Sequence, residues 1–248
     1  VLKTALGGYD GKGQTVIQTP EEAPSAWERL SALCPELILE QWIAFGMEIS
    51  VIAARSTTGE VRCFPAAENI HQNGILRLSI APARISPALQ EEAQRLARAI
   101  AEGMNVYGLI AVEMFVTRDG HLLVNELAPR PHNSGHYTQE ACVTSQFEQH
   151  VRAICGLPLG STRLLSPVVM LNLLGDEPDR VLRNLSTWPR EAKLHLYGKH
   201  EARPGRKMGH LNVLAPSLEE ALDTVEQYAR QLAIPWPAGS NHRHCSDK

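Results

Sequence analysis

Two β-prone runs, residues 109–117 and 121–127, stand on either side of Asp119-Gly120. An Asp-Gly pair between such runs is a strong signal for a tight β-hairpin, because both positions accept the positive φ of a two-residue turn. In that register Arg118 faces His121 and Glu113 faces Glu126. Two opposed carboxylates repel each other unless a cation lies between them. The pattern indicates a Mg²⁺ site, while a solvent-facing pair or a register broken by a bulge stays open.

The N-terminal segment is rich in glycine. The glycines lie between two β-prone runs, residues 1–4 and 15–19. Backbone amides of such a loop can approach an anion closely, and lysines add positive charge. The spacing matches neither the P-loop nor the dinucleotide pattern, so it favours a flap over phosphates, with an ordinary hairpin loop as the alternative. The residues concerned are Gly7, Gly8, Gly11, Gly13, Lys3 and Lys12.

Polar residues also gather directly after the second hairpin run. The segment 129–137 reads Pro-Arg-Pro-His-Asn-Ser-Gly-His-Tyr, which suits recognition of an anionic or hydroxyl-rich ligand at the end of a strand. Its alternative is a surface loop. A basic group at 203–207 could bind a phosphate or form a solvated face. Glu68 and His71 are either catalytic or structural.

Hydrophobic spacing and turn signals predict the remaining elements. Helices are expected at 21–33, at 87–103 after an N-cap at Ser86, up to about 155, and after a capping box at Ser217. Further strands are expected near 37–43, 48–56, 167–174, 192–198 and 210–214, whereas 65–82 appears polar and irregular.

Composition limits the function classes. The 248 residues carry a net charge of −3, which does not favour nucleic-acid binding. Five scattered cysteines without metal-ligand spacing indicate reduced thiols, and no apolar run reaches a membrane span, so we expect a cytoplasmic protein without a membrane partner. The chain opens within a β-prone run without Met, so we expect a leading part to be absent.

The order of the motifs resembles the N5-carboxyaminoimidazole ribonucleotide synthetase family of ATP-grasp enzymes. The matching residues are Lys3, Gly8-Tyr9-Asp10-Gly11-Lys12-Gly13-Gln14, Glu40-Gln41-Trp42-Ile43, Glu48, Glu113 and the run Asn125 to His136. The resemblance extends to about Ala215. It implies an α+β ATP-grasp fold, with antiparallel sheets, flanking helices and a small C-terminal β-rich subdomain. The expected divisions are 1–40, 41–160, 161–235 and a tail at 236–248.

The resemblance also implies roles for individual residues. Lys3 and the loop Gly8–Gln14 would clamp ATP phosphates, residues 40–43 would bind adenine, and Glu48 would hold the ribose. His71 and Asn125 would lie at the nucleotide, and Glu113 and Glu126 would hold Mg²⁺, with two ions expected. Lys3, Arg130 and His132 are the implied catalytic residues. Implied contacts to aminoimidazole ribonucleotide come from Tyr9, Asp10, Arg130, His132, Asn133, Ser134, Lys199, Arg206 and Lys207.

The implied reaction is a carboxylation in purine synthesis. Bicarbonate would attack the γ-phosphate of ATP to give carboxyphosphate, and the amine of aminoimidazole ribonucleotide would capture the carboxyl group. The family begins with a Rossmann-like domain that this chain lacks, and the intact protein is expected to be a homodimer. Another ATP-grasp ligase of purine synthesis and a non-catalytic nucleotide-binding fragment are the rival hypotheses.

Overall fold

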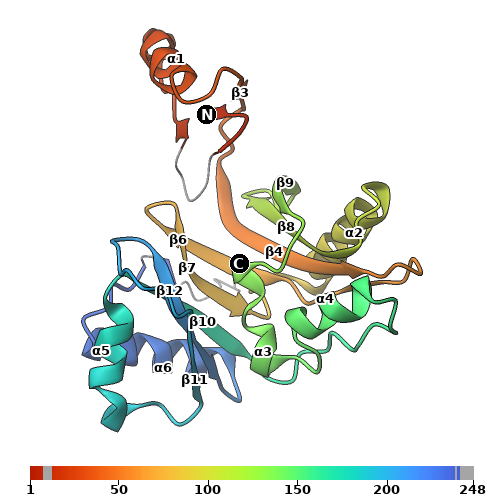
Figure 1. The fold of residues 1–248 in the computed structure, drawn as a ribbon, viewed down its shortest axis with the longest axis vertical. Coiled ribbons are helices and arrows are strands. Elements are labelled where there is room, and N and C mark those ends of the chain that lie inside the picture. The colour runs from red at the N-terminus through yellow and green to blue at the C-terminus, as the bar shows by residue number, and fades with distance from the viewer. Residues whose placement is uncertain (8–12, 238, 241–248) are drawn as a thin grey trace. The chain divides into compact units, whose positions relative to one another are not determined.

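A computed structural model of the chain describes residues 1–7, 13–237 and 239–240. The chain divides into two compact units (Figure 1). Unit 1 consists of Val1–Phe45 and Gln72–Ile75, and unit 2 consists of Gly46–His71 and Leu76–Lys248. The predicted boundaries at residues 40, 160 and 235 stay predictions.

Unit 1 is built on a three-stranded antiparallel sheet. Its central strand β1 (Leu2–Thr4) pairs with β2 (Gln14–Thr15) and with β3 (Leu37–Leu39). A 3₁₀ turn, η1 (Pro20–Glu22), leads into α1 (Ala23–Ser31), whose Ala26 and Leu30 pack on Leu2. β2 is shorter than the predicted strand because the Gln18 amide donates to the Glu22 carboxylate rather than to a neighbouring strand.

The second sheet has nine strands in the order β11-β12-β10-β7-β6-β4-β8-β9, with β5 paired to β4 outside this path. The C-terminal strands continue this sheet, because residues 168–171 of β10 pair antiparallel with residues 78–81 of β7. The strand bounds are β4 Phe45–Arg55, β5 Val61–Cys63, β6 Ala67–Gln72, β7 Ile75–Ala81, β8 Gly108–Thr117, β9 Leu122–Ala128, β10 Val168–Leu174, β11 Ala192–Leu196 and β12 Lys207–Leu214.

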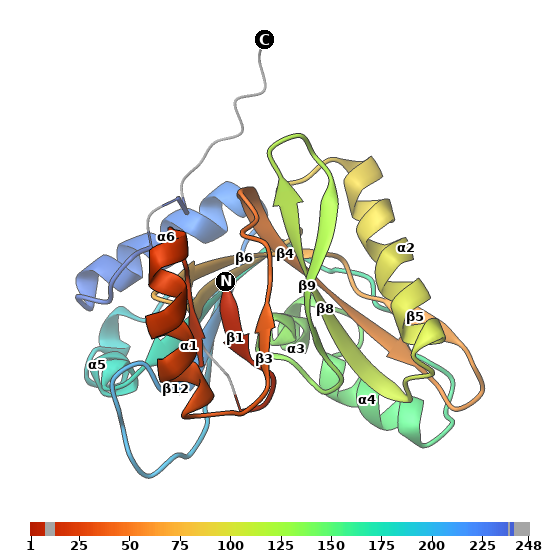
Figure 2. The same cartoon turned by 90° about the horizontal axis from the view of Figure 1, so that it is seen from above.

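Helices cover both faces of this sheet (Figure 2). On β4, Ile49 and Val51 face a cluster with α2, whereas Ile52 faces the cluster with α3 and α4, as the two-residue period of a strand requires. On β10, Val169 packs in the cluster with α5 and α6. The helix bounds are α2 Pro87–Gly103, η2 Asn133–Gly135, α3 Thr138–Ala141, α4 Gln146–Ile154, α5 Glu177–Arg183, η3 Leu185–Thr187 and α6 Leu218–Gln231.

Helix starts follow the predicted capping chemistry. The Ser86 hydroxyl accepts the Leu89 amide at 3.2 Å, with Pro87 in the first turn of α2. The Ser217 hydroxyl accepts the Glu220 amide at 3.2 Å and so begins α6. Both N-caps are confirmed, because each hydroxyl satisfies an amide that has no partner within its helix.

The register of the β8–β9 hairpin confirms one prediction and corrects another. Glu113 does face Glu126, but Arg118 does not face His121. The Thr117 amide donates to the His121 carbonyl at 2.9 Å, so the loop has three residues and ends at Gly120, where φ is 83°. A bulge at Asn125 restores the register, since Glu113 pairs with Glu126 while the next pair is Met114 with Val124. The two one-residue shifts cancel.

The segment predicted to be irregular, 65–82, is wrong in that respect. It contains β6 and β7, joined through Asn73 and Gly74 with φ of 53° and 74°. Both residues have the positive φ that a two-residue hairpin turn of the primed type needs. The polar residues of the segment are buried between neighbouring strands, where they bond to one another, so polarity here does not indicate a loop.

Candidate functional site

Unit 1 brings together three of the predicted nucleotide-binding residues. Lys3 on β1 pairs in register with Gln14 on β2, and its ammonium lies 2.5 Å from the Glu40 carboxylate. The Glu40 amide donates to the Val1 carbonyl at 2.8 Å, which fixes the chain after β3. Gln41 and Ile43 lie outside the strands, and Trp42 is 60% exposed. The residues Gly8, Tyr9, Asp10, Gly11 and Lys12 lie outside the described residues.

Unit 2 gathers three carboxylates and two histidines around β8. His71 Nδ1 lies 2.8 Å from Glu48 Oε2, and His132 Nε2 lies 3.3 Å from Glu113 Oε1. Burial, together with the charges of Glu126 and Glu48, raises the pKa of Glu113 despite the opposing charge of His71. Burial lowers the affinity of His71 for a proton, but its contact with Glu48 and the charge of Glu113 outweigh this and raise the pKa of His71. The cluster carries excess negative charge.

A magnesium ion fits the chemistry of these donors. Burial of Glu113 opposite Glu126 is costly unless a cation or a proton compensates the charge. In the described part of the chain, no group of three or more His, Cys, Asp or Glu side chains is arranged to hold a metal. This agrees with Mg²⁺ chemistry, which commonly uses one or two carboxylates and takes its remaining oxygens from water and substrate phosphates.

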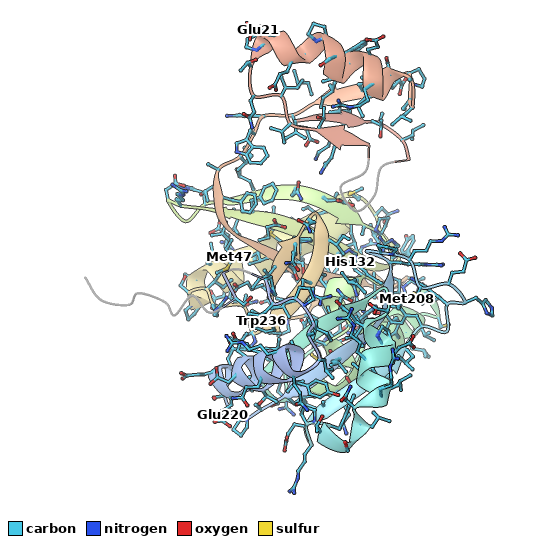
Figure 3. The ribbon with its side chains drawn as sticks, turned by 90° about the vertical axis from the view of Figure 1, so that its left-hand side faces the viewer. Glu21, Met47, His132, Met208, Glu220 and Trp236 are labelled. Carbon is cyan, nitrogen blue, oxygen red and sulfur yellow. The ribbon has the colours of Figure 1, made fainter. Side chains whose placement is uncertain are left out.

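The loop after β9 places His132 against this cluster (Figure 3). Gln146, the first residue of α4, accepts the His132 amide at 2.9 Å and donates to the His132 carbonyl at 2.8 Å. A Cβ at Gly135 would lie 2.8 Å from the Gln146 amide oxygen, so only glycine permits this close approach without a shift. Burial, with the nearby charges of Arg130 and Lys207, lowers the pKa of His132 to about 3. The loop therefore presents a neutral imidazole.

The predicted basic residues lie on different parts of unit 2. Lys207 on β12 acts electrostatically on Glu113 and His132, which places its charge at the cluster. The Lys199 ammonium donates to the Lys207 carbonyl at 2.6 Å. Arg206 and Arg130 are exposed, and their guanidinium groups donate to the carbonyls of Glu201 and Pro131 respectively. Lys199 and Lys207 are thus brought together.

Several buried polar residues of this region were missed by the sequence prediction. Asn172 on β10 exchanges two hydrogen bonds with Asn133, at 2.9 and 2.7 Å. Arg77 on β7 forms a buried bidentate pair with Glu177, with both bonds at 2.8 Å. Asn73-Gly74 was the available signal for Arg77, because it would have placed the following residues on a strand.

The chain belongs to the ATP-grasp domain family, whose model matches residues 1–147. The phosphoribosylaminoimidazole carboxylase C-terminal domain model matches residues 168–224. The chain is similar to the N5-carboxyaminoimidazole ribonucleotide synthase of Bacillus subtilis, with 55% identity over 227 residues. That match covers 91% of this chain but 58% of the relative, so the chain spans little more than half the length of that protein.

Solved structures give the same result. An N5-carboxyaminoimidazole ribonucleotide synthetase in complex with ADP superposes with a TM-score of 0.86 and 52% identity, over 94% of this chain and 60% of that one. The Aspergillus clavatus N5-carboxyaminoimidazole synthase, in complex with ADP and 5-aminoimidazole ribonucleotide, gives 0.83 and 36% identity, over 94% and 60%. The predicted ATP-grasp fold and the family resemblance are confirmed. Within the described residues, no helix is long and apolar enough to cross a membrane.

Proposed function

We propose that this chain carries the nucleotide and carboxylation site of an ATP-dependent carbon–nitrogen ligase. It would use ATP and bicarbonate to carboxylate aminoimidazole ribonucleotide through carboxyphosphate in purine biosynthesis. The similarity to the B. subtilis relative over 91% of the chain is the observation that carries the proposal. A homodimer of the intact protein and a cytoplasmic location are parts of the same proposal.

Glu113 and Glu126 would hold the magnesium ions that accompany ATP. Their opposition on β8 and β9 supports this role, because the raised pKa of Glu113 indicates uncompensated negative charge. Magnesium supplies neutralisation of phosphate charge in phosphoryl transfer. Asn125, displaced by the bulge beside Glu126, would contribute a polar contact to the same nucleotide. Glu48 and His71, already paired, would bind its ribose side.

The residues of unit 1 would bind the other parts of ATP. Lys3 would contact phosphate together with Gly13, Gln14 and the loop 8–12, and residues 40–43 would contact adenine. The 2.5 Å contact between Lys3 and Glu40 supports a preorganised charge at this position. Binding there would exchange part of an ion pair for contacts to an anion, so the lysine would keep a negatively charged partner in both states.

The loop after β9 would bind aminoimidazole ribonucleotide. Arg130, His132, Asn133 and Ser134 offer a cation, an imidazole, an amide and a hydroxyl on one short segment, and its attachment to Gln146 makes it rigid. Lys199, Arg206 and Lys207 would contact the substrate phosphate. No protein nucleophile is required, so the rate enhancement would come from positioning and from charge neutralisation.

The test is phosphate release from Mg-ATP and bicarbonate, measured with and without aminoimidazole ribonucleotide. The proposal expects stimulation by this acceptor and none by glycinamide ribonucleotide with formate. Stimulation by the second pair instead would identify a different ATP-grasp ligase. ATP binding without release, in this chain and in a longer one that includes a leading domain, would contradict a catalytic role.

A further inference from the structure

A continuous line of buried hydrogen bonds runs from the second sheet to His132. We call it the serine–asparagine chain, and its members, which come from η2, β4, β6 and β7 in this order, are Ser134, Ser50, Asn69 and Ser79. The three links join Ser50 to Ser134, Asn69 to Ser50 and Ser79 to Asn69, each at 2.8 Å. All four residues are buried. Burying so many polar groups is unfavourable unless every one is bonded, and this chain satisfies them through one another.

The direction of every bond in the chain follows from one fixed donor. The backbone N–H of Ser134 points at His132 Nδ1 at 3.3 Å, and a backbone amide can only donate. Nδ1 must therefore carry its lone pair, so the Ser134 hydroxyl, 2.8 Å from the same nitrogen, also donates to it.

The remaining links follow in turn, because each hydroxyl has one proton to donate. Ser134 uses its proton on His132, so it accepts from Ser50. Ser50 has then used its own proton and must accept from the amide nitrogen of Asn69. The Asn69 carbonyl oxygen is left to accept from Ser79. All links therefore donate toward the imidazole, and a reversal would require each member to turn.

A neutral imidazole with a lone pair on Nδ1 carries its proton on Nε2. In this structure Nε2 faces the Glu113 carboxylate at 3.3 Å. We propose that the serine–asparagine chain is a positioning element that holds His132 as the Nε2–H tautomer, so that the loop presents a hydrogen-bond donor, and never an acceptor, to an anionic oxygen. The consequence for turnover rests on the proposed function: this oxygen would belong to the carboxyl group being transferred or to a phosphate.

The tautomer can be measured without turnover. Ring ¹⁵N chemical shifts distinguish a protonated from an unprotonated nitrogen, and a long-range ¹H–¹⁵N spectrum of the whole chain at pH 7.5 would display all its histidines. The His132 signals are those that disappear in His132→Gln. We expect a protonated Nε2 and an unprotonated Nδ1 in the unaltered chain. A protonated Nδ1 would overturn the proposal, whatever the activity of the protein.

Two substitutions test whether the chain is responsible. Ser50→Ala removes the donor to Ser134, whose hydroxyl can then point either way, so His132 should become a mixture of tautomers. Asn69→Asp is nearly isosteric but replaces the donating amide by an acceptor, so Ser50 should turn toward it and the Nδ1–H form should increase. Ser56→Ala is the matched control: it removes another buried hydroxyl just after β4, bonded to Thr58 and Glu60.

The outcomes separate positioning from simple packing. Circular dichroism checks that each variant is folded, and an unchanged His132 tautomer in both Ser50→Ala and a folded Asn69→Asp would contradict the proposal. In the phosphate-release assay, Ser50→Ala should lower kcat about tenfold, the lower end of the loss when a supporting hydrogen bond to a functional ligand is removed, with an unchanged KM for ATP. If the tautomer shifts but no acceptor stimulates the unaltered chain, the proposed function fails and the positioning remains.

Discussion

Replacing His210 by asparagine should flatten the decline of stability of this chain in mild acid. His210 lies on β12 with 1% of its surface exposed. Its ring stacks on His195 at 4.5 Å between centroids, and its Nδ1 lies 2.9 Å from the Tyr197 hydroxyl. Burial, with the charges of His136 and His195, lowers the pKa of His210 to about 2 from 6.5.

The sign and the magnitude follow from proton linkage. Between pH 2 and 6.5 the unfolded chain binds a proton at His210 that the folded chain excludes, so the free energy of unfolding falls as the pH falls. The loss is about 1.4 kcal/mol per pH unit below 6.5, hence about 2 kcal/mol between pH 7 and pH 5. Burial lowers the pKa of His136 to about 4, so a second histidine adds to the same decline.

Urea unfolding followed by circular dichroism at pH 7 and pH 5 measures this difference directly. His210→Asn keeps a polar atom near Tyr197 but cannot take up a proton, so its loss between the two pH values should be smaller than that of the unaltered chain by about 2 kcal/mol. The exposed His200, changed in the same way, is the control and should leave the decline unaltered. Equal declines in all three proteins would refute the assignment of a neutral, buried His210.

Three further predictions concern the site and its support. Glu126→Ala should abolish Mg-dependent phosphate release yet change the free energy of unfolding by no more than about 0.5 kcal/mol, because Glu126 is exposed; near-normal turnover would remove it from the metal site. His132→Ala should raise the KM for aminoimidazole ribonucleotide more than that for ATP, and equal changes would argue against the loop as the recognition element. Arg77→Met should lower the free energy of unfolding by about 3–5 kcal/mol, since it leaves Glu177 buried without its partner, and the added Glu177→Leu should recover much of the loss in urea titrations.

The sequence predicted the elements whose local signals and tertiary packing agree. α2 begins where Ser86 and Pro87 indicate, and its apolar face packs on β4 and β8 as the helical spacing requires. The C-terminal strands were also predicted, but the sheet that they join was not. The pairing of β10 with β7 links residues about 90 positions apart, and local periodicity carries no information on such partners.

The hairpin shows how a correct site can follow from an incomplete argument. The facing of Glu113 and Glu126 was predicted from a two-residue loop, and the structure reaches the same pairing through a three-residue loop and a bulge. Asp-Gly signals are compatible with both loop lengths, since Gly120 has positive φ in either. A bulge is not visible in a short sequence, because it depends on the partner strand.

The segment around β6 and β7 failed for a reason that belongs to the site itself. Strand prediction expects alternating apolar residues, yet Asn69, Arg77 and Ser79 occupy buried positions. In an ordinary core these positions would be apolar, because unbonded polar groups are costly there. Here they are bonded to groups that support the loop of His132 and the strand of Asn172. A strand that lies beneath a polar site therefore resembles a loop in its sequence, and the same residues that obscured the strand are those that we expect to orient the imidazole.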